Sequence, residues 1–414
     1  MKILLLNRTF YPDVAATAQH AADLASELAA RGHDVTVIAG RRAYDDPDRQ
    51  FAKQETWLNV RIIRIPHSHF GKSSRWRRAA DFATFLTACA IRVSLLPHFD
   101  VVIALTSPPL VSLIGAIATK LRGGSLIYWV MDLNPDEAIA AGWLRKNSCA
   151  GIILSFLSRY TLRAADRIIV LDRFMQKRIC DTGIAAGKIR VIPPWAHDRV
   201  VRYDPDGRLA FRKTHGLANK FVIMYSGNHS PCHPLDTLLE AARTLAARPE
   251  FVFCFIGGGS HFRKVYDYSN QSNLANILCF PYQPLNKLSA SLSSADLHVV
   301  VMGNAFAGIV HPSKIYNILN LGTPLLYVGP TPSHVTDLVP ENAHGRWFYH
   351  AEHGSAAAVV HNILEAHKSA ARRTRDEIRI AARFSQRVLI PELIEEIELG
   401  HLRPAAEAGL SLTA

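Results

Sequence analysis

The 414-residue chain lacks the uninterrupted apolar stretch that a membrane-spanning helix needs. Its longest apolar region, residues 101–121, is broken by Pro108 and Pro109, which predicts a strand followed by a helix. The six cysteines are widely spaced, without a Cys-x-x-Cys pair or a zinc-ligand spacing, and this favours reduced thiols in a cytoplasmic protein. The apolar part of the N-terminus is too short for a signal peptide, so we expect a soluble or peripheral protein.

Several catalytic signatures are also missing. No Gly-x-Gly-x-x-Gly motif follows the first expected strand, which argues against a dinucleotide oxidoreductase. There is no evident Ser-His-Asp order, cysteine nucleophile or nucleic-acid-binding motif. The Asp-x-Asp triplets at 46–48 and 204–206 each contain proline in a polar loop, so turns explain them better than a metal site. We expect no catalytic metal.

Acidic residues are scarce: 35 against 47 basic ones, for a net charge of +12. Such a balance suits an anionic membrane surface or a phosphorylated ligand. Residues 61–78 contain six basic side chains and no acidic one, and a helical pattern follows over 81–96. Because each basic residue near an anionic bilayer contributes ~1 kcal/mol, this segment is either a docking surface or a solvated loop. The expected membrane-binding residues are Lys72, Arg75, Trp76, Arg77 and Arg78.

Apolar strands alternate with amphipathic helices, which predicts a parallel α/β architecture. The pattern restarts after Pro194, and residues 196–207, with their Asp-Pro-Asp-Gly turn, read as a linker. We therefore expect domains at 1–200 and 201–384, with a C-terminal helix at about 385–402 that can pack back on the first. Strands are expected at 3–6, 35–39, 60–65, 101–105, 126–131, 167–171, 189–193, 221–225, 251–256, 277–280, 297–301 and 325–328. Two doubly wound domains facing each other place a ligand cleft between the carboxyl ends of their strands.

The segment 311–329, HPSKIYNILNLGTPLLYVG, predicts a short helix aimed at an anion. Ser313 is placed as its N-cap, Lys314 lies in its first turn, and Gly322 ends it in a left-handed cap. A lysine at the positive end of a helix dipole is unfavourable unless an anion binds there. Asn317 lies on the same face. The alternative is a lysine in open solvent.

Two loops after expected strands suit a nucleotide diphosphate. One carries Ser226, Gly227, Asn228 and His229, with His233 just before the next helix. The other begins with three glycines at 257–259, where missing side chains let backbone amides approach a ligand. An ordinary tight turn explains the three glycines equally well.

An ordered series of segments resembles the retaining family 4 glycosyltransferases of the GT-B fold, over nearly the whole chain. The segments are FYPDVAATAQ, LAARGHDVTVI, LTSPPL, WVMDLNPDEA, RAADRIIVLDRFM, IPPW, YSGNHSPCHPLDTLLEA, FPYQP, SSADLHVVVM and PSKIYNILNLGTPLLYVGP. Within this family the chain is most similar to bacterial surface-polysaccharide transferases with a PSK-Y segment.

The resemblance implies an α/β protein with two Rossmann-like domains and no cofactor. Its activity would be hexosyl or N-acetylhexosaminyl transfer from a nucleoside-diphosphate sugar, with UDP favoured. The acceptor would be a glycan or a polyprenyl-pyrophosphate-linked saccharide in cell-surface polysaccharide synthesis. The enzyme would then lie on the inner face of the plasma membrane.

The resemblance also implies roles for individual residues. Lys314 would be the main cation on the pyrophosphate, assisted by His233 and by the amides of the 310–313 loop. Asp132 would orient or deprotonate the acceptor hydroxyl, although it could instead cap the turn that follows it. The remaining expected contacts are Thr17 and Gln19 near phosphate and acceptor, Gly257, Gly258 and Tyr282 toward the nucleotide, and Val310, His311, Ser313 and Asn317 around the donor.

The chain departs from the family pattern at its usual charged positions. The two family glutamates would fall at Ile309 and Asn317, and the family's arginine and lysine near Asn228 and His233. Two alternatives therefore stay open: a non-catalytic partner subunit, or a GT-B sugar-nucleotide epimerase that needs no acceptor.

Overall fold

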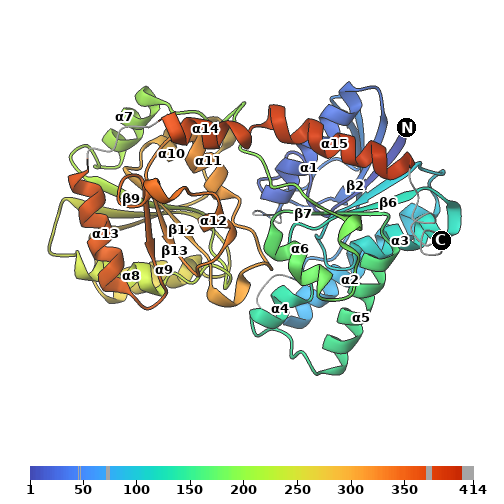
Figure 1. Cartoon of the computed structure of the whole chain (residues 1–414), viewed down its shortest axis with the longest axis horizontal. Coiled ribbons are helices and arrows are strands. Elements are labelled where there is room, and N and C mark those ends of the chain that lie inside the picture. The colour runs from blue at the N-terminus through green and yellow to red at the C-terminus, as the bar shows by residue number, and fades with distance from the viewer. Residues whose placement is uncertain (45, 47, 71–74, 370–374, 403–414) are drawn as a thin grey trace, which may run out of the picture. The chain divides into compact units, whose positions relative to one another are not determined.

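The chain divides into two compact units, each built around its own sheet (Figure 1). The computed structural model describes residues 1–44, 46, 48–70, 75–369 and 375–402. Unit 1 contains Met1–Pro193, Gly308–His311 and the residues from Leu389 onward, and unit 2 contains Pro194–Ala307 and Pro312–Val388. Both units have the doubly wound α/β architecture that the sequence predicts.

Unit 1 holds an eight-stranded sheet in the order β3-β4-β2-β1-β5-β6-β7-β8. Every neighbouring pair is parallel except β3 and β4, which are antiparallel at the edge. The strands are β1 (Lys2–Leu6), β2 (Asp34–Gly40), β3 (Gln54–Trp57), β4 (Val60–Ile65), β5 (Val101–Ala104), β6 (Ser125–Trp129), β7 (Arg167–Val170) and β8 (Ile189–Val191). The central strands read as continuous apolar runs because helices cover both faces of the sheet.

The helices of unit 1 form two layers, with α1 and α15 on one face of the sheet and α2, α3, α5 and α6 on the other (Figure 1). They are α1 (Ala16–Ala30), α2 (Arg75–Ser94), α3 (Val111–Arg122), α4 (Asp136–Ala140), α5 (Cys149–Ala164), α6 (Arg173–Cys180) and α15 (Gln386–Leu402). The C-terminal α15 is held to the sheet by Glu396, which pairs with Arg167 and Arg190. Within the described residues, no helix combines the length and apolar character needed to span a bilayer.

Unit 2 holds a six-stranded parallel sheet in the order β11-β10-β9-β12-β13-β14. Its strands are β9 (Phe221–Asn228), β10 (Phe251–Gly258), β11 (Ile277–Phe280), β12 (Leu297–Val301), β13 (Leu325–Val328) and β14 (Phe348–Ala351). Its helices are α7 (Pro205–Thr214), α8 (Asp236–Thr244), α9 (Phe262–Gln271), α10 (Leu285–Ser293), α11 (Lys314–Leu321), α12 (His334–Asp337), α13 (Ala356–Lys368) and α14 (Arg375–Arg383).

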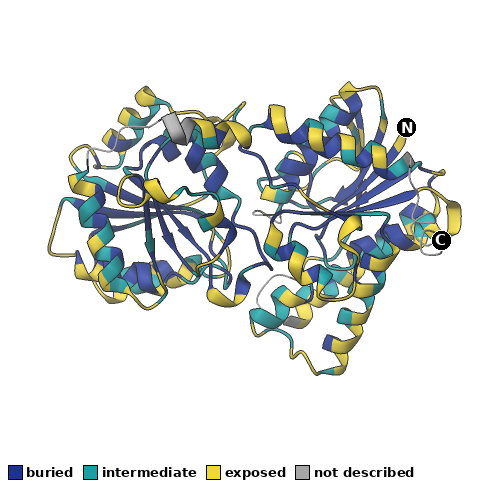
Figure 2. Ribbon diagram, in the orientation of Figure 1, coloured by how far each residue is buried: buried dark blue, intermediate teal, exposed yellow. Residues whose placement is uncertain are grey.

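Buried residues form a core on each face of the unit 2 sheet, and the strands of this sheet are coloured largely as buried in Figure 2. On one face, residues of α8, α9 and α13 pack against alternate positions of the strands, including Phe251, Phe253 and Phe255. On the other face, residues of α7, α10 and α11 cover Val252 and Cys254. This alternation follows from the two-residue period of a strand.

The chain direction reverses at one strand in each sheet. In unit 1 the strand is β1, which lies between β2 and β5, and in unit 2 it is β9, which lies between β10 and β12. Loops leave the carboxyl ends of the neighbouring strands in opposite directions at such a point, and ligands of open α/β sheets bind there. The loops after β1 and β5, and those after β9 and β12, are therefore the places to look for a site.

All twelve strands expected from the sequence are present. Two further strands, β3 and β14, were not expected. Edge strand β3 has the polar sequence QETW and pairs only on one side, so it carries no apolar run. The expected linker at 196–207 is wrong at its end, because its Asp-Pro-Asp-Gly turn is the start of α7. There Asp204 caps the helix by accepting a hydrogen bond from the Gly207 N–H at 2.8 Å, with Pro205 in the first turn.

A carboxylate shared by two arginines ties α7 to the unit 2 sheet. Asp296, just before β12, accepts hydrogen bonds from Arg208 at 2.5 Å and from Arg212 at 2.9 Å. It also accepts from the Val222 N–H of β9 at 2.8 Å. Arg212 is buried, so its charge depends on this partner.

Replacing Asp296 by Ala should therefore lower the free energy of unfolding by about 3–5 kcal/mol, because a buried guanidinium loses its counter-charge. Chemical denaturation followed by circular dichroism measures the effect. Asp267→Ala is the matched control, since Asp267 is half exposed and its oxygen lies 3.7 Å from Arg263. Equal losses in the two variants would contradict the assigned role of Asp296.

Candidate functional site

Lys314 is the first residue of α11, at the reversal point of unit 2. The preceding Ser313 already has helical dihedral angles, φ −66° and ψ −14°, and its side chain makes no capping hydrogen bond. The prediction that Ser313 caps the helix is therefore wrong. The predicted left-handed end at Gly322 is confirmed, with φ +67° and ψ +35°. The N-terminal amides of α11 thus have no side-chain cap, which leaves them available to an external acceptor.

The ammonium group of Lys314 is buried over an aromatic ring. Its Nζ lies 3.6 Å from the ring centroid of Tyr225 on β9. Within the described part of the chain, this nitrogen has no hydrogen-bond partner. Burial lowers the pKa of Lys314 to about 7. The alternative of a lysine in open solvent is therefore excluded.

The ring compensates only part of the cost of burying this ammonium, because the hydrogen-bonding capacity of Nζ stays unused within the described residues. The ring provides a cation–π attraction, but the ammonium carries three hydrogen-bond donors, and leaving them unpaired is costly. An anion at the start of α11 would accept from the ammonium and from the backbone amides together. The local chemistry therefore suits a phosphate or diphosphate.

Glycines at the ends of β9 and β10 make room for this arrangement. Gly227 and Gly257 are paired across the two strands. A Cβ on Gly227 would lie 3.0 Å from Nζ of Lys314, and a Cβ on Gly257 would lie 2.1 Å from the Gly227 carbonyl oxygen. Both residues have positive φ, +138° and +136°. Only glycine fits at either position.

Gly258 and Tyr282 lie against each other at the end of β10. A Cβ on Gly258 would be 2.9 Å from the ring of Tyr282, whose hydroxyl donates to the Gly258 carbonyl at 3.4 Å. Tyr282 is half exposed, so it is no core tyrosine. The ordinary tight turn considered for the three glycines does not describe these residues, because the first two belong to β10.

His229 is a packing residue. It was expected to bind the donor, but its side chain is buried and offers no surface to a ligand. Its side chain is fully inaccessible, and its ring packs edge-on against Tyr225 and Phe262, with centroid distances of 4.9 Å in both cases. Its Nδ1 lies 3.0 Å from the Gly227 carbonyl oxygen. Burial, followed by repulsion from Lys314, lowers the pKa of His229 to about 3, so the ring is neutral.

His233 lies in the same cluster and is also neutral. Its Nδ1 is 2.7 Å from the Val301 carbonyl oxygen of β12, which requires Nδ1–H as the donor and leaves Nε2 as an acceptor. Burial, followed by repulsion from Lys314, lowers the pKa of His233 to about 3. Its expected part as a second cation is therefore corrected: a neutral His233 can accept from a hydroxyl, and Lys314 carries the positive charge of this cluster.

Three other expected donor residues have different surroundings. Asn317 uses its Oδ1 to accept from the His197 N–H at 2.9 Å, so it fixes α11 to the start of unit 2. Ser226 is half buried within β9, and Asn228 is exposed at the end of that strand. Asn228 is thus the polar side chain that stands freest at the carboxyl end of β9.

Val310 and His311 belong to unit 1, which corrects their placement in the second domain; their contact with the donor stays a prediction. Nδ1 of His311 lies 2.7 Å from Oδ2 of Asp172, the residue that caps α6, and both side chains are buried. One residue before Val310, the Ile309 carbonyl accepts from the Leu133 N–H at 2.9 Å. The segment Gly308–His311 is thus anchored beside the loop that carries Asp132.

Asp132 follows β6 in unit 1 and is half buried. Burial, followed by repulsion from Glu137, raises its pKa to about 8. The next helix, α4, has Pro135 at its N-cap and no side-chain capping bond, so the alternative role of Asp132 as a cap is not supported. A carboxyl group that titrates near neutral pH suits proton transfer.

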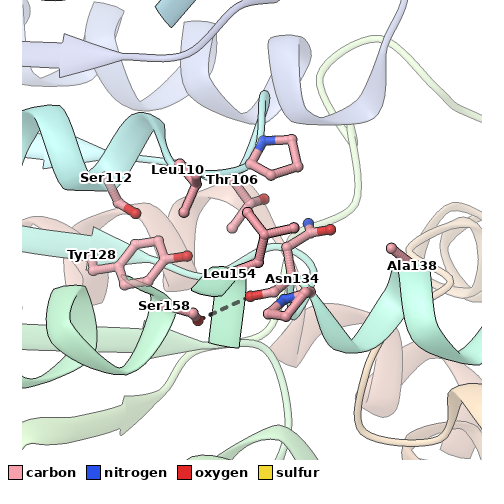
Figure 3. A pocket seen from close by; sticks show the side chains of 10 residues that line it. Thr106, Leu110, Ser112, Tyr128, Asn134, Ala138, Leu154 and Ser158 are labelled. Atoms are coloured by element: carbon pink, nitrogen blue, oxygen red, sulfur yellow. Dashed lines mark hydrogen bonds between the residues drawn. The ribbon is translucent and has the colours of Figure 1, made fainter. Parts of the chain in front are cut away.

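A recess of about 60 Å³ lies beside this loop, between the start of α3 and the side of α5 (Figure 3). It is smaller than the ~150 Å³ cavity that holds a benzene ring, so it has no room for a sugar. Within it, Ser158 of α5 donates to the Asn134 carbonyl at 2.9 Å (Figure 3). This bond fixes the Asp132 loop to α5. The residues that line the recess are Thr106, Pro109, Leu110, Ser112, Tyr128, Asn134, Pro135, Ala138, Leu154 and Ser158.

Thr17 and Gln19 lie in the first turn of α1, at the reversal point of unit 1. The Thr17 hydroxyl is 3.2 Å from that of Thr9, and the Gln19 amide donates to the Val14 carbonyl at 3.2 Å. Both contacts hold the loop after β1 against the helix. Their side chains therefore shape this loop, and their contact with phosphate or acceptor stays a prediction.

Two residues near the reversal points were not singled out from the sequence. One is Tyr225, whose ring supports Lys314 and whose only signal was its position two residues before Gly227. The other is Arg8, the second residue after β1, whose guanidinium lies 5.1 Å above the ring of Phe82. Burial lowers the pKa of Arg8, although Tyr44 and the nearby carboxylates oppose this shift. A basic residue in the loop that follows the strand of reversal is the signal that could have found it.

The expected membrane segment is only partly described. Lys72 lies outside the described residues, as does the side chain of Arg75. Trp76 and Arg77 are exposed, whereas Arg78 is half buried with its guanidinium 4.4 Å above the ring of Trp143.

Comparison with known proteins agrees with this architecture. A glycosyl transferase 4-like domain model matches residues 16–195, and a glycosyl transferases group 1 model matches residues 208–380. The chain is 26% identical over 336 residues to a protein of Escherichia coli K12 described as the colanic acid biosynthesis glycosyl transferase WcaI, covering 78% of this chain and 82% of that one. It is 24% identical over 288 residues to the glycosyltransferase WbjE of Pseudomonas aeruginosa, covering 70% and 72%.

Among solved structures, Anabaena HepE in complex with UDP and glucose superimposes with a TM-score of 0.72 at 16% identity, covering 96% of this chain and 99% of that one. This likeness concerns the fold. Together with the two consecutive domain models, it establishes that the chain belongs to the glycosyltransferases of the GT-B fold.

Proposed function

We propose that unit 2 binds the diphosphate of a nucleoside-diphosphate sugar at the N-terminus of α11, and that the enzyme transfers the sugar with retention of configuration. The observation that carries this proposal is the buried ammonium of Lys314, which has a ring on one side and no hydrogen-bond acceptor among the described residues. A diphosphate supplies the missing acceptors and the opposite charge.

The relatives support a choice of substrates. HepE has been solved with UDP and glucose, and WcaI is named for colanic acid biosynthesis. We therefore favour a UDP-linked hexosyl or N-acetylhexosaminyl donor, and an acceptor used in cell-surface polysaccharide synthesis. Thermal-shift measurements against a panel of nucleoside-diphosphate sugars test the donor, because a specific ligand stabilises the folded state by mass action.

The chemistry of transfer places the greatest demand on the leaving group. As the bond between the anomeric carbon and the diphosphate breaks, negative charge grows on the diphosphate oxygens. Lys314 and the uncapped amides of α11 are aimed at that charge before the reaction starts, which is the arrangement that lowers a barrier most. The acceptor hydroxyl attacks from the face that the diphosphate leaves, so no covalent intermediate with the protein forms.

The acceptor hydroxyl also has to lose a proton. Asp132 of unit 1 is the side chain best suited to orient that hydroxyl or to take its proton, because its pKa of about 8 makes the carboxylate a stronger base than an ordinary aspartate. The two other roles considered for this chain give different results in solution. An epimerase interconverts a lone sugar nucleotide, and a non-catalytic subunit binds nucleotide without releasing or transferring sugar under any acceptor.

Replacing Lys314 by Met should lower turnover by about 10²-fold or more, because a preorganised charge is lost from the leaving group. The same variant should melt a few degrees higher without ligand, since a buried ammonium is removed from the folded state. Initial rates and thermal melts measure the two effects. Lys287→Met, at an exposed position of α10, should change neither, and near wild-type turnover in the Lys314 variant would refute the assignment.

UDP affinity should weaken with rising pH. Only the ammonium form of Lys314 attracts the diphosphate, and a bound anion raises its pKa above the value of about 7 in the free enzyme. The Kd should therefore rise by about tenfold per pH unit above pH 7, until the pKa of the complex is reached. Isothermal titration calorimetry in buffers of different ionisation enthalpy should also show proton uptake on binding. In Lys314→Arg, which stays charged throughout, the slope should vanish; a slope like that of the wild type would assign the effect to another group.

The rate with saturating donor should increase as pH rises through about 8, because the carboxylate of Asp132 is the form that accepts the proton. Asp132→Asn should lower kcat by 10²- to 10⁴-fold and abolish this ascending limb, while leaving the affinity for UDP unchanged. A pH profile of kcat for both enzymes measures this. An ascending limb that survives in the asparagine variant would exclude Asp132 as the base.

A further inference from the structure

Three neighbouring helices of unit 1 present apolar side chains to solvent. Helix α3 packs against both α2 and α5 on one face of the sheet (Figure 1). On α5, Ile152, Ile153 and Phe156 are 58%, 57% and 61% exposed, and on α3 Leu121 is 76% exposed. Exposed residues follow the outer side of α5 in Figure 2. An apolar surface of this kind on a soluble domain marks an interaction site.

The same helices carry positive charge and almost no negative charge. Lys120, Arg159 and Arg163 are exposed on α3 and α5, which contain no acidic residue. The only acidic residue of α2 is Asp81, which is buried and accepts from the Ser68 hydroxyl and the Phe70 N–H, both at 2.9 Å. Apolar side chains flanked by basic ones, without carboxylates between them, match the acyl chains and anionic headgroups of a bilayer surface.

We propose that the exposed side of α3 and α5, called here the α3–α5 face, docks on an anionic lipid bilayer. The apolar side chains enter the headgroup region while Lys120, Arg159 and Arg163 meet the phosphates. A partner protein of acidic surface would not need the run of large aliphatic side chains, and none of the described helices spans a bilayer, so the contact is interfacial. This surface lies beyond the basic segment at 72–78 that the sequence indicated.

The α3–α5 face is joined to the proposed acceptor site. Ser158 of α5 holds the Asn134 carbonyl, two residues after Asp132 (Figure 3). Leu154 of the same helix lines the recess beside that loop. A bilayer at α5 would therefore bring the Asp132 loop near the lipid headgroups. This second step rests on the proposed function: it selects an acceptor sugar carried on a membrane lipid rather than a free glycan.

The experiment is sedimentation of the full chain with vesicles of phosphatidylglycerol and phosphatidylcholine in equal parts, compared with vesicles of phosphatidylcholine alone. We expect binding to the anionic vesicles, weakened by salt, and little binding to the neutral ones. The double variant Ile152→Ser with Phe156→Ser should lose at least about tenfold in partitioning, because two apolar side chains no longer enter the bilayer. The double variant Arg159→Glu with Arg163→Glu should lose the preference for anionic vesicles.

Leu209→Ser is the matched control, since Leu209 is 67% exposed on α7 of unit 2 and should not affect vesicle binding. Stabilisation by UDP is measured on every variant, so that failure of the docking surface and failure of the Lys314 assignment are distinguishable. Unchanged binding of the serine variant, or equal binding to both kinds of vesicle, would overturn the proposal. So would a wild-type dimer that does not bind vesicles and that the serine substitutions convert to a monomer, because the face would then join two copies of the chain.

Discussion

The position of one ammonium group constrains the end of β9 in unit 2. Nζ of Lys314 lies over the ring of Tyr225, and it has room there because the next-to-last residue of β9 is Gly227. Gly227 in turn lies so close to β10 that Gly257 can carry no side chain. The reversal of chain direction at β9 supplies the opening between the loops. Strand order, the positions of the glycines and the start of α11 together define the space that the Lys314 ammonium occupies.

None of the described groups around this cation offers it an opposite charge, which leaves it available to the diphosphate that we propose. His229 and His233 stay neutral, and no described carboxylate pairs with Lys314. No ion pair within the described residues therefore neutralises the ammonium. A salt bridge would have made the folded chain more stable and the ammonium less available. Where the family pattern would place an arginine and a lysine, this chain has Asn228 and His233 nearby, and Lys314 is the buried cation of the cluster. Burial lowers the pKa of Lys314, but it also lowers the local dielectric constant and so strengthens the attraction between the ammonium form and an anion.

The sequence predicted the features that depend on local pattern. Apolar runs located twelve strands, and the lysine at a helix start located the centre of the candidate site. The sequence did not reveal the contacts of side chains whose partners lie far along the chain. His311 is bound by Asp172, Asn317 by the backbone of His197, and His229 by the rings of Tyr225 and Phe262. Each of these residues stands in a polar loop or on a helix in a way that suits ligand binding equally well, so only the tertiary contacts separate the two roles.

The short segment Gly308–His311 has a consequence for how the molecule can be divided. It is encoded in the middle of the second half of the chain, but it packs in unit 1, where Gly308 lies against Phe174 and His311 pairs with Asp172. A fragment that ends near Pro193 would lack the segment Gly308–His311 and α15. The Asp172 carboxylate would then lose its contact with the His311 ring. Unit 1 is therefore complete only when two segments from the second half of the chain, Gly308–His311 and the residues from Leu389 onward, are present as well.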